Sequence, residues 1–224
     1  MNLETARFNM IEQQIRPWDV LDPAVLSLLA TVRREDFVPP ALRALAFVDT
    51  QVPLLPGQAQ GPCMLEPKVE ARLLQELQVH RHEKVLEVGT GSGFMAALLA
   101  HRAQQVLTLE CQPELARMAR ASLQRNGVAN VRVLDVDAAT GAQGLAAEAP
   151  FDVILLSGSV PEVPRALLQQ LKLGGRLAAV VGEEPVMVAR LFTRVGDAAW
   201  SEADLFDTVA PRLQGFAEPS HFHF

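Results

Sequence analysis

A glycine-rich segment is the part of this sequence where residue types and spacing point most clearly to chemistry. Residues 84–94 read KVLEVGTGSGF, in which glycines stand at every second position between an apolar run and the apolar segment FMAALLA. This order is typical of a strand, a tight turn and a helix, the arrangement in which α/β proteins hold a nucleotide-like cofactor. The candidate cofactor-binding loop consists of Gly89, Thr90, Gly91, Ser92 and Gly93.

Carboxylates near the ends of three predicted strands extend this candidate site. Glu87 lies on a strand expected to be buried, where a carboxylate is costly unless it is paired, and a cationic ligand would pair with it. Glu110 ends the second strand and is suited to accept hydrogen bonds from both ribose hydroxyls of NAD or of an adenosyl sulfonium. Asp137 follows the third strand and is placed to bond an adenine amino group. Their neighbours Cys111 and Ala138 complete the expected cofactor contacts, with Cys111 packing near the adenosine rather than reacting.

The glycine spacing separates two cofactor classes. The dinucleotide fingerprint is GxGxxG, whose third glycine allows close packing beside a pyrophosphate. Here the spacing is GxGxG, and Phe94 occupies the place of that third glycine, which disfavours a bound pyrophosphate. The ordered glycine loop and three carboxylates resemble S-adenosylmethionine-dependent methyltransferases of the Rossmann-like type. The resemblance implies S-adenosylmethionine as cofactor and S-adenosylhomocysteine as product; the alternative is a structural glycine turn with two capping acids.

The second part of the chain supplies the elements that position this loop. From residue 84, short apolar strands alternate with helical segments, which predicts an α/β fold with a doubly wound, mostly parallel sheet. The expected strands are KVLEVG, QVLTLE, VRVLDV, FDVILLSG and GRLAAVVG, and the expected helices are FMAALLAHRA, PELARMARASLQRNG and PRALLQQLK. A turn at 172–175 separates the last helix from its strand. The tail segments MVARLFTRVG and ADLFDTVAPRL predict two final strands, antiparallel at one edge.

The first part of the chain is different in pattern. We expect one helix over residues 5–15, a second that begins after the N-cap Asp22, and a third over residues 68–77. The chain before the third helix is rich in proline and glycine and is expected to be loop or extended chain. The expected organisation is a helical and loop extension, residues 1–80, that forms part of the acceptor site, and a Rossmann-like cofactor domain, residues 81–224, in one compact unit.

Composition limits the partners and the compartment. Apolar residues make up 49% of the chain, yet no run approaches the ~18 residues of a membrane span. The net charge of −6, without a Lys/Arg cluster, disfavours nucleic-acid binding. The two cysteines lack CxxC spacing, so neither a disulfide framework nor a zinc site is expected. No signal peptide is visible, and we expect a cytoplasmic protein.

The resemblance narrows when further segments are included. VRREDFVPPALRALAFVD, the following VPL, KVLEVGTGSGF, APFDVILLSGSVPEVPRALLQQLKLGGRL and VVG look like the protein-L-isoaspartate O-methyltransferase family, up to about residue 182. This resemblance implies methyl transfer to the free carboxylate of isoaspartyl residues in damaged proteins, which begins their repair through a succinimide. It also implies a protein or peptide substrate, and Asp49 as a support of the acceptor loop or a turn cap.

One stretch departs from that family. Where the family carries Gly-Gln-Thr-Ile-Ser-Gln-Pro, with hydroxyls that face the substrate carboxylate, residues 61–67 read GPCMLEP. Cys63 and Leu65 therefore hold the positions of the family's hydroxyl residues, and neither replaces them as a strong donor. Glu66 would repel a carboxylate if it pointed inward. An alternative alignment through residues 57–60 supplies no hydroxyl either.

Serines after the fourth strand are further candidates. Ser157 and Ser159 follow FDVILL at the strand end where doubly wound sheets place their chemistry. They are placed to contact the acceptor or the methionine portion of the cofactor, and they are equally typical of a turn. Cys63 as a covalent nucleophile is disfavoured, because no histidine is tied to it by pattern.

The histidines do not predict a metal site. His80 and His82 lie in a polar turn, and His221 and His223 lie at the C-terminus. Neither HxH pair has a third ligand at suitable spacing, so no metal is expected.

Several functions remain open at this point. The first is an S-adenosylmethionine-dependent O-methyltransferase acting on isoaspartyl residues. The second keeps that chemistry with another acceptor, including a small molecule, because of the residues at 63–65. The third is a cofactor-binding module without transfer activity. A dehydrogenase is the last, and the glycine spacing speaks against it. The oligomeric state is not predicted.

Overall fold

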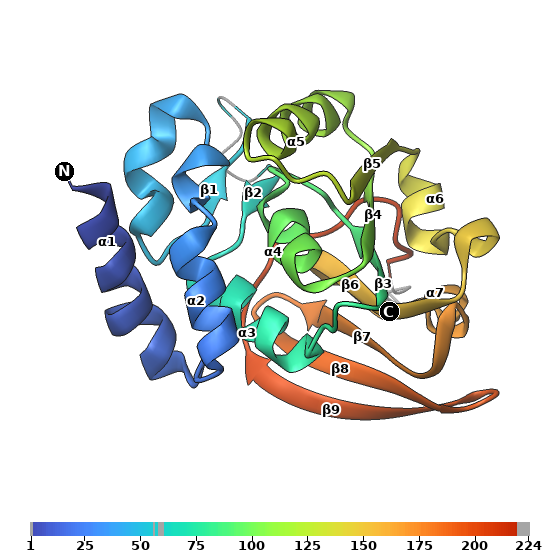
Figure 1. Cartoon of the computed structure of the whole chain (residues 1–224). Coiled ribbons are helices and arrows are strands. Elements are labelled where there is room, and N and C mark those ends of the chain that lie inside the picture. The colour runs from blue at the N-terminus through green and yellow to red at the C-terminus, as the bar shows by residue number, and fades with distance from the viewer. Residues whose placement is uncertain (1, 56, 58–60, 219–224) are drawn as a thin grey trace, which may run out of the picture.

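The computed structural model of the chain describes residues 2–55, 57 and 61–218 (Figure 1). Gln58, Ala59 and Gln60 of the alternative alignment lie outside the described residues, as do His221 and His223.

One seven-stranded sheet, in the order β5-β4-β3-β6-β7-β8-β9, forms the centre of the molecule. The first five strands of this order pair in parallel, and β8 and β9 add an antiparallel edge. The doubly wound α/β fold and the antiparallel edge are therefore confirmed. The strands are β3 (Lys84–Val88), β4 (Gln105–Glu110), β5 (Val131–Asp135), β6 (Phe151–Val160), β7 (Leu171–Glu183), β8 (Val186–Gly196) and β9 (Ala199–Asp207).

Helices cover both faces of the sheet, as the alternation of the strand residues requires. Val85 and Val153 join a core with the N-terminal helices, α4 and α5, whereas Leu86 and Ile154 face α7 and the segment after α6. The helices are α1 (Leu3–Met10), α2 (Pro23–Thr31), α3 (Pro67–Leu77), α4 (Phe94–Arg102), α5 (Pro113–Arg125), α6 (Ala138–Gln143) and α7 (Arg165–Gln169). None of the helices in the described ranges is long and apolar enough to cross a membrane.

Shorter elements complete the N-terminal region, which lies beside α4 in Figure 1. A two-stranded antiparallel pair, β1 (Val52–Pro53) and β2 (Cys63–Met64), lies within the stretch expected to be loop or extended chain. This region also contains a π-helix, Ile11–Ile15, and three 3₁₀ helices, Arg16–Trp18, Arg34–Asp36 and Pro40–Phe47. A further 3₁₀ helix, Ala146–Glu148, lies between α6 and β6.

The start of the chain differs from prediction at a proline. The first helix was expected to stop before Pro17, yet helical chain continues through the π-helix into the 3₁₀ helix that contains it. Pro17 is the second residue of that 3₁₀ helix, and because it has no N–H to donate, the π-helical hydrogen bonding ends just before it. The predicted cap of α2 is confirmed, since the Asp22 side chain accepts a hydrogen bond from the backbone N–H of Ala24 at 2.8 Å.

The turn predicted at residues 172–175 lies within β7 and does not separate the helix from its strand. This segment belongs to β7, and α7 ends at Gln169. Leu171 already pairs with Phe151 in the sheet, and the register shifts before Arg176 pairs with Val153. Gly174, with φ of +78°, allows the backbone to deviate within the strand.

A buried arginine joins the N-terminal region to the rest of the molecule. Arg34 is 1% exposed, forms an ion pair with Glu70 of α3, and donates a hydrogen bond to the carbonyl of Leu65 at 2.7 Å. Its guanidinium also lies 5.1 Å from the ring centroid of Phe94, the first residue of α4. One side chain thus contacts α3, α4 and the chain that enters α3.

We predict that Arg34→Met lowers the free energy of unfolding by about 3–5 kcal/mol, because it leaves the buried Glu70 carboxyl without its cation. Urea denaturation measures this loss. Arg43→Met is the matched control, since Arg43 pairs with Asp36 at the surface and such pairs contribute about 0–1 kcal/mol. Equal effects of the two substitutions would contradict the structural role of Arg34.

Candidate functional site

A cleft of about 620 Å³ opens where β3, β4 and β6 end. Cavities of about 300–1,000 Å³ are usual for small-molecule sites, and this position is where doubly wound sheets bind ligands. The cleft brings together most of the residues expected from the sequence to form a site. Those that line it are Cys63, Gly89, Gly91, Glu110, Cys111, Ala138 and Ser157.

The glycine turn has the conformation that its sequence predicts. Gly89, Gly91 and Gly93 all have positive φ, between +53° and +92°. A Cβ atom on Gly89 would lie 2.7 Å from Cδ2 of Leu213, a contact that the flexible leucine side chain can relieve, so the φ of +92° is the main reason for glycine there. Phe94 is buried against Phe37, with ring centroids 5.5 Å apart. The chain after the turn is therefore used for packing of α4.

The polar residues of the turn lie behind the cleft. Thr90 and Ser92 are buried and line a smaller adjoining cavity of about 30 Å³. The Thr90 hydroxyl lies 2.7 Å from the Thr108 hydroxyl, and Ser92 Oγ accepts a hydrogen bond from the backbone N–H of Phe94 at 3.2 Å. These contacts support the shape of the turn.

Glu110 connects the glycine turn to the end of β4. One carboxylate oxygen accepts from the N–H of Gly91 at 2.8 Å, and the other accepts from the N–H of Gln112 at 3.1 Å. Glu110 is 6% exposed and lines the cleft. Because each carboxylate oxygen has two acceptor positions, both oxygens retain capacity for a ligand hydroxyl.

Glu87 is fully buried beneath the turn. Its two oxygens accept hydrogen bonds from the hydroxyls of Thr108 and Ser157, each at 2.7 Å. Burial raises the pKa of Glu87 to about 7; the two hydroxyls oppose this shift, and the carboxylates of Glu110 and Glu70 add to it. A buried carboxylate was expected to have a partner, and among the described residues its partners are the neutral hydroxyls of Thr108 and Ser157.

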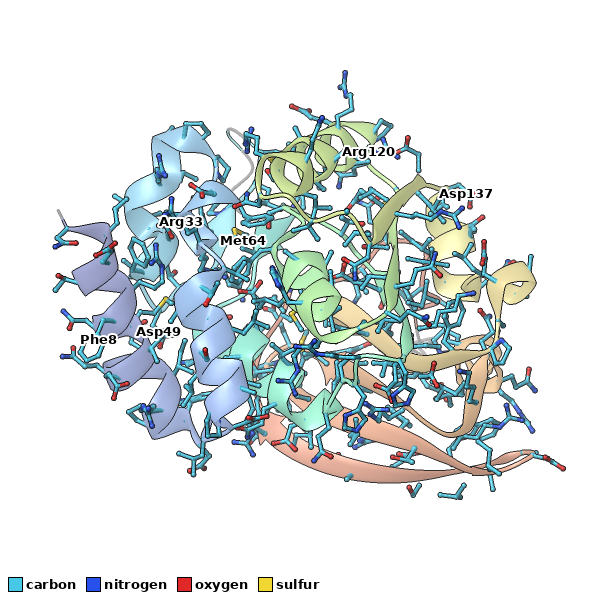
Figure 2. The ribbon with its side chains drawn as sticks, viewed as in Figure 1. Phe8, Arg33, Asp49, Met64, Arg120 and Asp137 are labelled. Atoms are coloured by element: carbon cyan, nitrogen blue, oxygen red, sulfur yellow. The ribbon has the colours of Figure 1, made fainter. Side chains whose placement is uncertain are left out.

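Asp137 does not line the cleft. Its carboxylate is exposed and caps α6, accepting from the N–H of Thr140 at 2.8 Å and from its hydroxyl at 2.9 Å. These bonds lower the pKa of Asp137. Figure 2 shows this residue beside α6, and its neighbours Val136 and Ala138 line the cleft instead. The contact between Asp137 and an adenine amino group stays a prediction.

The cysteines of the cleft are protonated thiols. The Cys63 thiol donates to Oε1 of Gln51 at 3.4 Å, and burial raises its pKa to about 12, with the charges of Glu66 and Glu70 adding to the shift. Burial also raises the pKa of Cys111, whose Sγ lies 3.7 Å from Oε1 of Gln214. A thiolate nucleophile is therefore disfavoured at either position.

Gly61 and Pro62 of the departing stretch line the cleft with Cys63, whereas Met64 and Leu65 lie inside the protein. Met64 and Leu65 are buried, and Figure 2 shows Met64 between the N-terminal helices and the sheet. Leu65 borders the small cavity behind the turn. One carboxylate oxygen of Glu66 is buried without a hydrogen-bond partner among the described residues, and Glu66 lines neither cavity. Its charge acts on the cleft by adding to the raised pKa of Cys63.

The remaining candidates are supporting residues. Ser159 is fully buried, and only Ser157 of the two serines reaches the cleft. Asp49 forms an ion pair with Lys68 of α3 at 2.7 Å, and its support of an acceptor loop stays a prediction. The rings of His80 and His82 stack at 5.9 Å. No group of three potential metal ligands occurs among the described side chains.

One wall of the cleft was not expected from the sequence. The last strand was expected to run to residue 213, whereas β9 ends at Asp207 and residues 209–214 line the cleft. The carbonyl of Val209 accepts from Nε2 of Gln51 at 3.0 Å, and the carbonyl of Pro211 accepts from the N–H of Ser159 at 2.7 Å. Pro211 was the available signal, because proline cannot donate within a strand.

Comparison with known proteins identifies relatives over most of the chain. A family model described as protein-L-isoaspartate(D-aspartate) O-methyltransferase matches residues 6–209. A protein-L-isoaspartate O-methyltransferase of Koribacter versatilis is 43% identical over 176 residues, which cover 79% of this chain and 76% of the relative. A protein-L-isoaspartate O-methyltransferase 2 of Marinobacter nauticus is 39% identical over 215 residues, which cover 96% and 95%.

Two solved structures show the same fold. One, a protein-L-isoaspartate O-methyltransferase, has a TM-score of 0.76 at 22% identity and covers 95% of this chain and 66% of its own. The other is a putative protein-L-isoaspartate O-methyltransferase from Plasmodium falciparum in complex with S-adenosyl-L-homocysteine. It has a TM-score of 0.75 at 19% identity and covers 96% and 99% of the two chains.

We predict that the stability of the ligand-free protein falls as pH rises through about 7, partly because of Glu87. The folded-state pKa of Glu87 is raised from 4.5 to about 7, so its contribution is complete below pH 4.5 and is lost as pH rises through 7. This contribution is on the order of 3 kcal/mol. The free energy of unfolding, measured by denaturation from pH 4.5 to 8, should depend less on pH in Glu87→Gln than in the wild type. Part of the remaining dependence is due to Glu70, because burial also raises its pKa to about 7. Identical slopes would contradict the prediction.

Proposed function

This chain belongs to the protein-L-isoaspartate(D-aspartate) O-methyltransferase family and is an S-adenosylmethionine-dependent methyltransferase, and from this premise we propose that it methylates the free carboxylate of isoaspartyl residues in proteins or peptides. The observation that carries the proposal is the family match over residues 6–209. That range includes the N-terminal region as well as the glycine loop. The glycine loop alone would support only the cofactor.

The residues of the cleft suit an adenosyl sulfonium. Glu110 would hold the ribose, because it lines the cleft and both of its oxygens retain acceptor capacity. The turn at Gly89 and Gly91 leaves space that a side chain would fill, and Ala138, which lines the cleft, would contact the adenine. When bound, S-adenosylmethionine supplies a methyl group whose C–S bond breaks, with its electron pair going to sulfur, as the O–CH₃ bond forms.

Glu87 would favour a positively charged ligand. Its raised pKa reflects burial without a cation, and a positive charge nearby favours the ionised carboxylate and lowers that pKa. Ser157 connects Glu87 to the cleft, since its hydroxyl donates to Glu87 and it lines the cleft wall.

The acceptor requires little chemical assistance. A carboxylate with a reference pKa of ~3.9 is already ionised at neutral pH, so no general base is needed and the protein acts by proximity and orientation. Cys63 and Ser157 border the cleft where the acceptor would enter, and Gln51 joins Cys63 to the far wall. The extension, residues 1–80, would thus form the acceptor side and residues 81–224 the cofactor side.

We further propose a cytoplasmic location. Both cysteines are free thiols, as is usual for proteins of reducing compartments. Fractionation of cells that express the protein would test this.

The proposed function is tested by transfer of labelled methyl from S-adenosylmethionine to a synthetic isoaspartyl peptide, with the matched aspartyl peptide as control. Calorimetry of S-adenosylhomocysteine binding in the same preparation shows whether the cofactor site is intact. We expect label on the isoaspartyl peptide alone. Cofactor binding without transfer to either peptide would refute the isoaspartyl acceptor and favour another acceptor, such as a small molecule.

A separate prediction concerns the missing hydroxyls. Cys63→Ala should leave kcat/KM for the isoaspartyl peptide within about threefold, because the thiol is protonated and a weak donor. Cys63→Thr should raise kcat/KM about tenfold, which corresponds to ~1.4 kcal/mol, by restoring a hydroxyl at the acceptor side. Cys111→Thr is the matched control in the same cleft and should give no gain. A large loss in Cys63→Ala would instead indicate a direct role for the thiol.

A further inference from the structure

The charges around the cleft are unevenly distributed. Among the described residues that line it, Arg212 is the only cationic side chain, whereas Glu110 and Glu184 are anionic. The whole chain carries a net charge of −6. An anionic acceptor therefore approaches a negative protein, and a single guanidinium in the cleft is the local group that attracts it.

Arg212 is held in place by part of its donor set. Its Nη2 donates to the carbonyl of Gly182 at 3.0 Å, and its Nε lies 3.4 Å from the carboxylate of Glu218. Its Nη1 is buried and has no acceptor among the described residues. A guanidinium presents five N–H donors, and a buried N–H without an acceptor is costly. The side chain is thus positioned, with hydrogen-bonding capacity remaining.

The backbone places Arg212 beside the end of β6. The residues on either side of it bond to Ser159, through the Pro211 carbonyl at 2.7 Å and the Leu213 N–H at 2.9 Å. Ser157, two residues earlier on β6, lines the same cleft. The Gln51 side chain bonds both to the carbonyl of Val209 and to the thiol of Cys63. The segment 209–214 is therefore also connected to the strand that carries Cys63.

We propose that Arg212 binds and orients the free carboxylate of the acceptor, in place of the hydroxyls absent at positions 63 and 65. The proposal rests on the proposed function and specifies its acceptor site. The Arg212 side chain is 28% exposed, and its carboxylate neighbour Glu218 is 60% exposed, so an incoming carboxylate can replace this weak contact. A planar guanidinium suits a carboxylate because it offers two parallel N–H donors.

The cofactor also carries a carboxylate, on its methionine portion, and the experiment must separate the two sources. Arg212→Met removes the charge, Arg212→Gln removes it while keeping a donor toward Gly182, and Arg212→Lys keeps the charge alone. Arg190→Met is the matched control, because Arg190 pairs with Asp204 and Glu202 on the outer strands and does not line the cleft. Thermal unfolding confirms which variants fold.

The measurements are kcat and KM for the isoaspartyl peptide and calorimetric Kd for S-adenosylhomocysteine. We expect the two neutral variants to raise KM at least tenfold, with kcat at saturation within about threefold and the Kd for S-adenosylhomocysteine within about twofold. Arg212→Lys recovers part of the loss, and Arg190→Met resembles the wild type. An unchanged KM overturns the proposal, and so does a tenfold weaker S-adenosylhomocysteine affinity with unchanged KM, which would assign Arg212 to the cofactor.

The wild type separates failure of this inference from failure of the proposed function. If the wild type methylates the isoaspartyl peptide and the neutral variants do so equally well, only the role of Arg212 is wrong. If the wild type binds S-adenosylhomocysteine but methylates no isoaspartyl peptide, the proposed function is wrong, and the role of Arg212 falls with it.

Discussion

The buried guanidinium of Arg34 is the constraint on which both sides of the cleft depend. Removing a charge from water is costly unless the charge is paired, and here the partners are Glu70 and the carbonyl of Leu65, whereas Nε of Arg34 has no hydrogen-bond partner among the described residues. The same group lies over Phe94, which begins the helix after the glycine turn. The strand that carries Cys63 is thereby held at a fixed position relative to the turn. The chain that enters α3 and the helix after the glycine turn are joined because one buried cation contacts both.

This constraint separates the parts of the site that can change from those that cannot. The chain entering α3 is held through its backbone carbonyl at Leu65, and this contact does not depend on the side chains at 63 and 65. The carboxylate of Glu110 has a more restricted role, because it is bonded to the backbone N–H groups of both Gly91 and Gln112. Because the acceptor is already ionised, loss of hydroxyls changes its orientation rather than its reactivity.

Those features that depend on local pattern could be predicted from the sequence. The strands of the sheet follow from their apolar runs, and the positive φ angles of the turn follow from its glycines. Features that depend on which of several possible hydrogen-bond partners a group binds could not be predicted. Asp137 follows its strand as expected, but the nearby Thr140 N–H and hydroxyl bind its carboxylate and make it a helix cap. Residues 209–213 have the apolar pattern of a strand, yet they form a wall of the cleft because their backbone bonds to Ser159 and Gln51.

The measurement that tests the account most directly is a crystal structure of the protein with S-adenosylhomocysteine and an isoaspartyl peptide bound together. The account predicts that the free carboxylate of the isoaspartyl residue lies in the cleft between Cys63, Ser157 and Arg212, with the cofactor ribose on Glu110. Peptide bound with that carboxylate outside the cleft, or ribose bound away from Glu110, would contradict it.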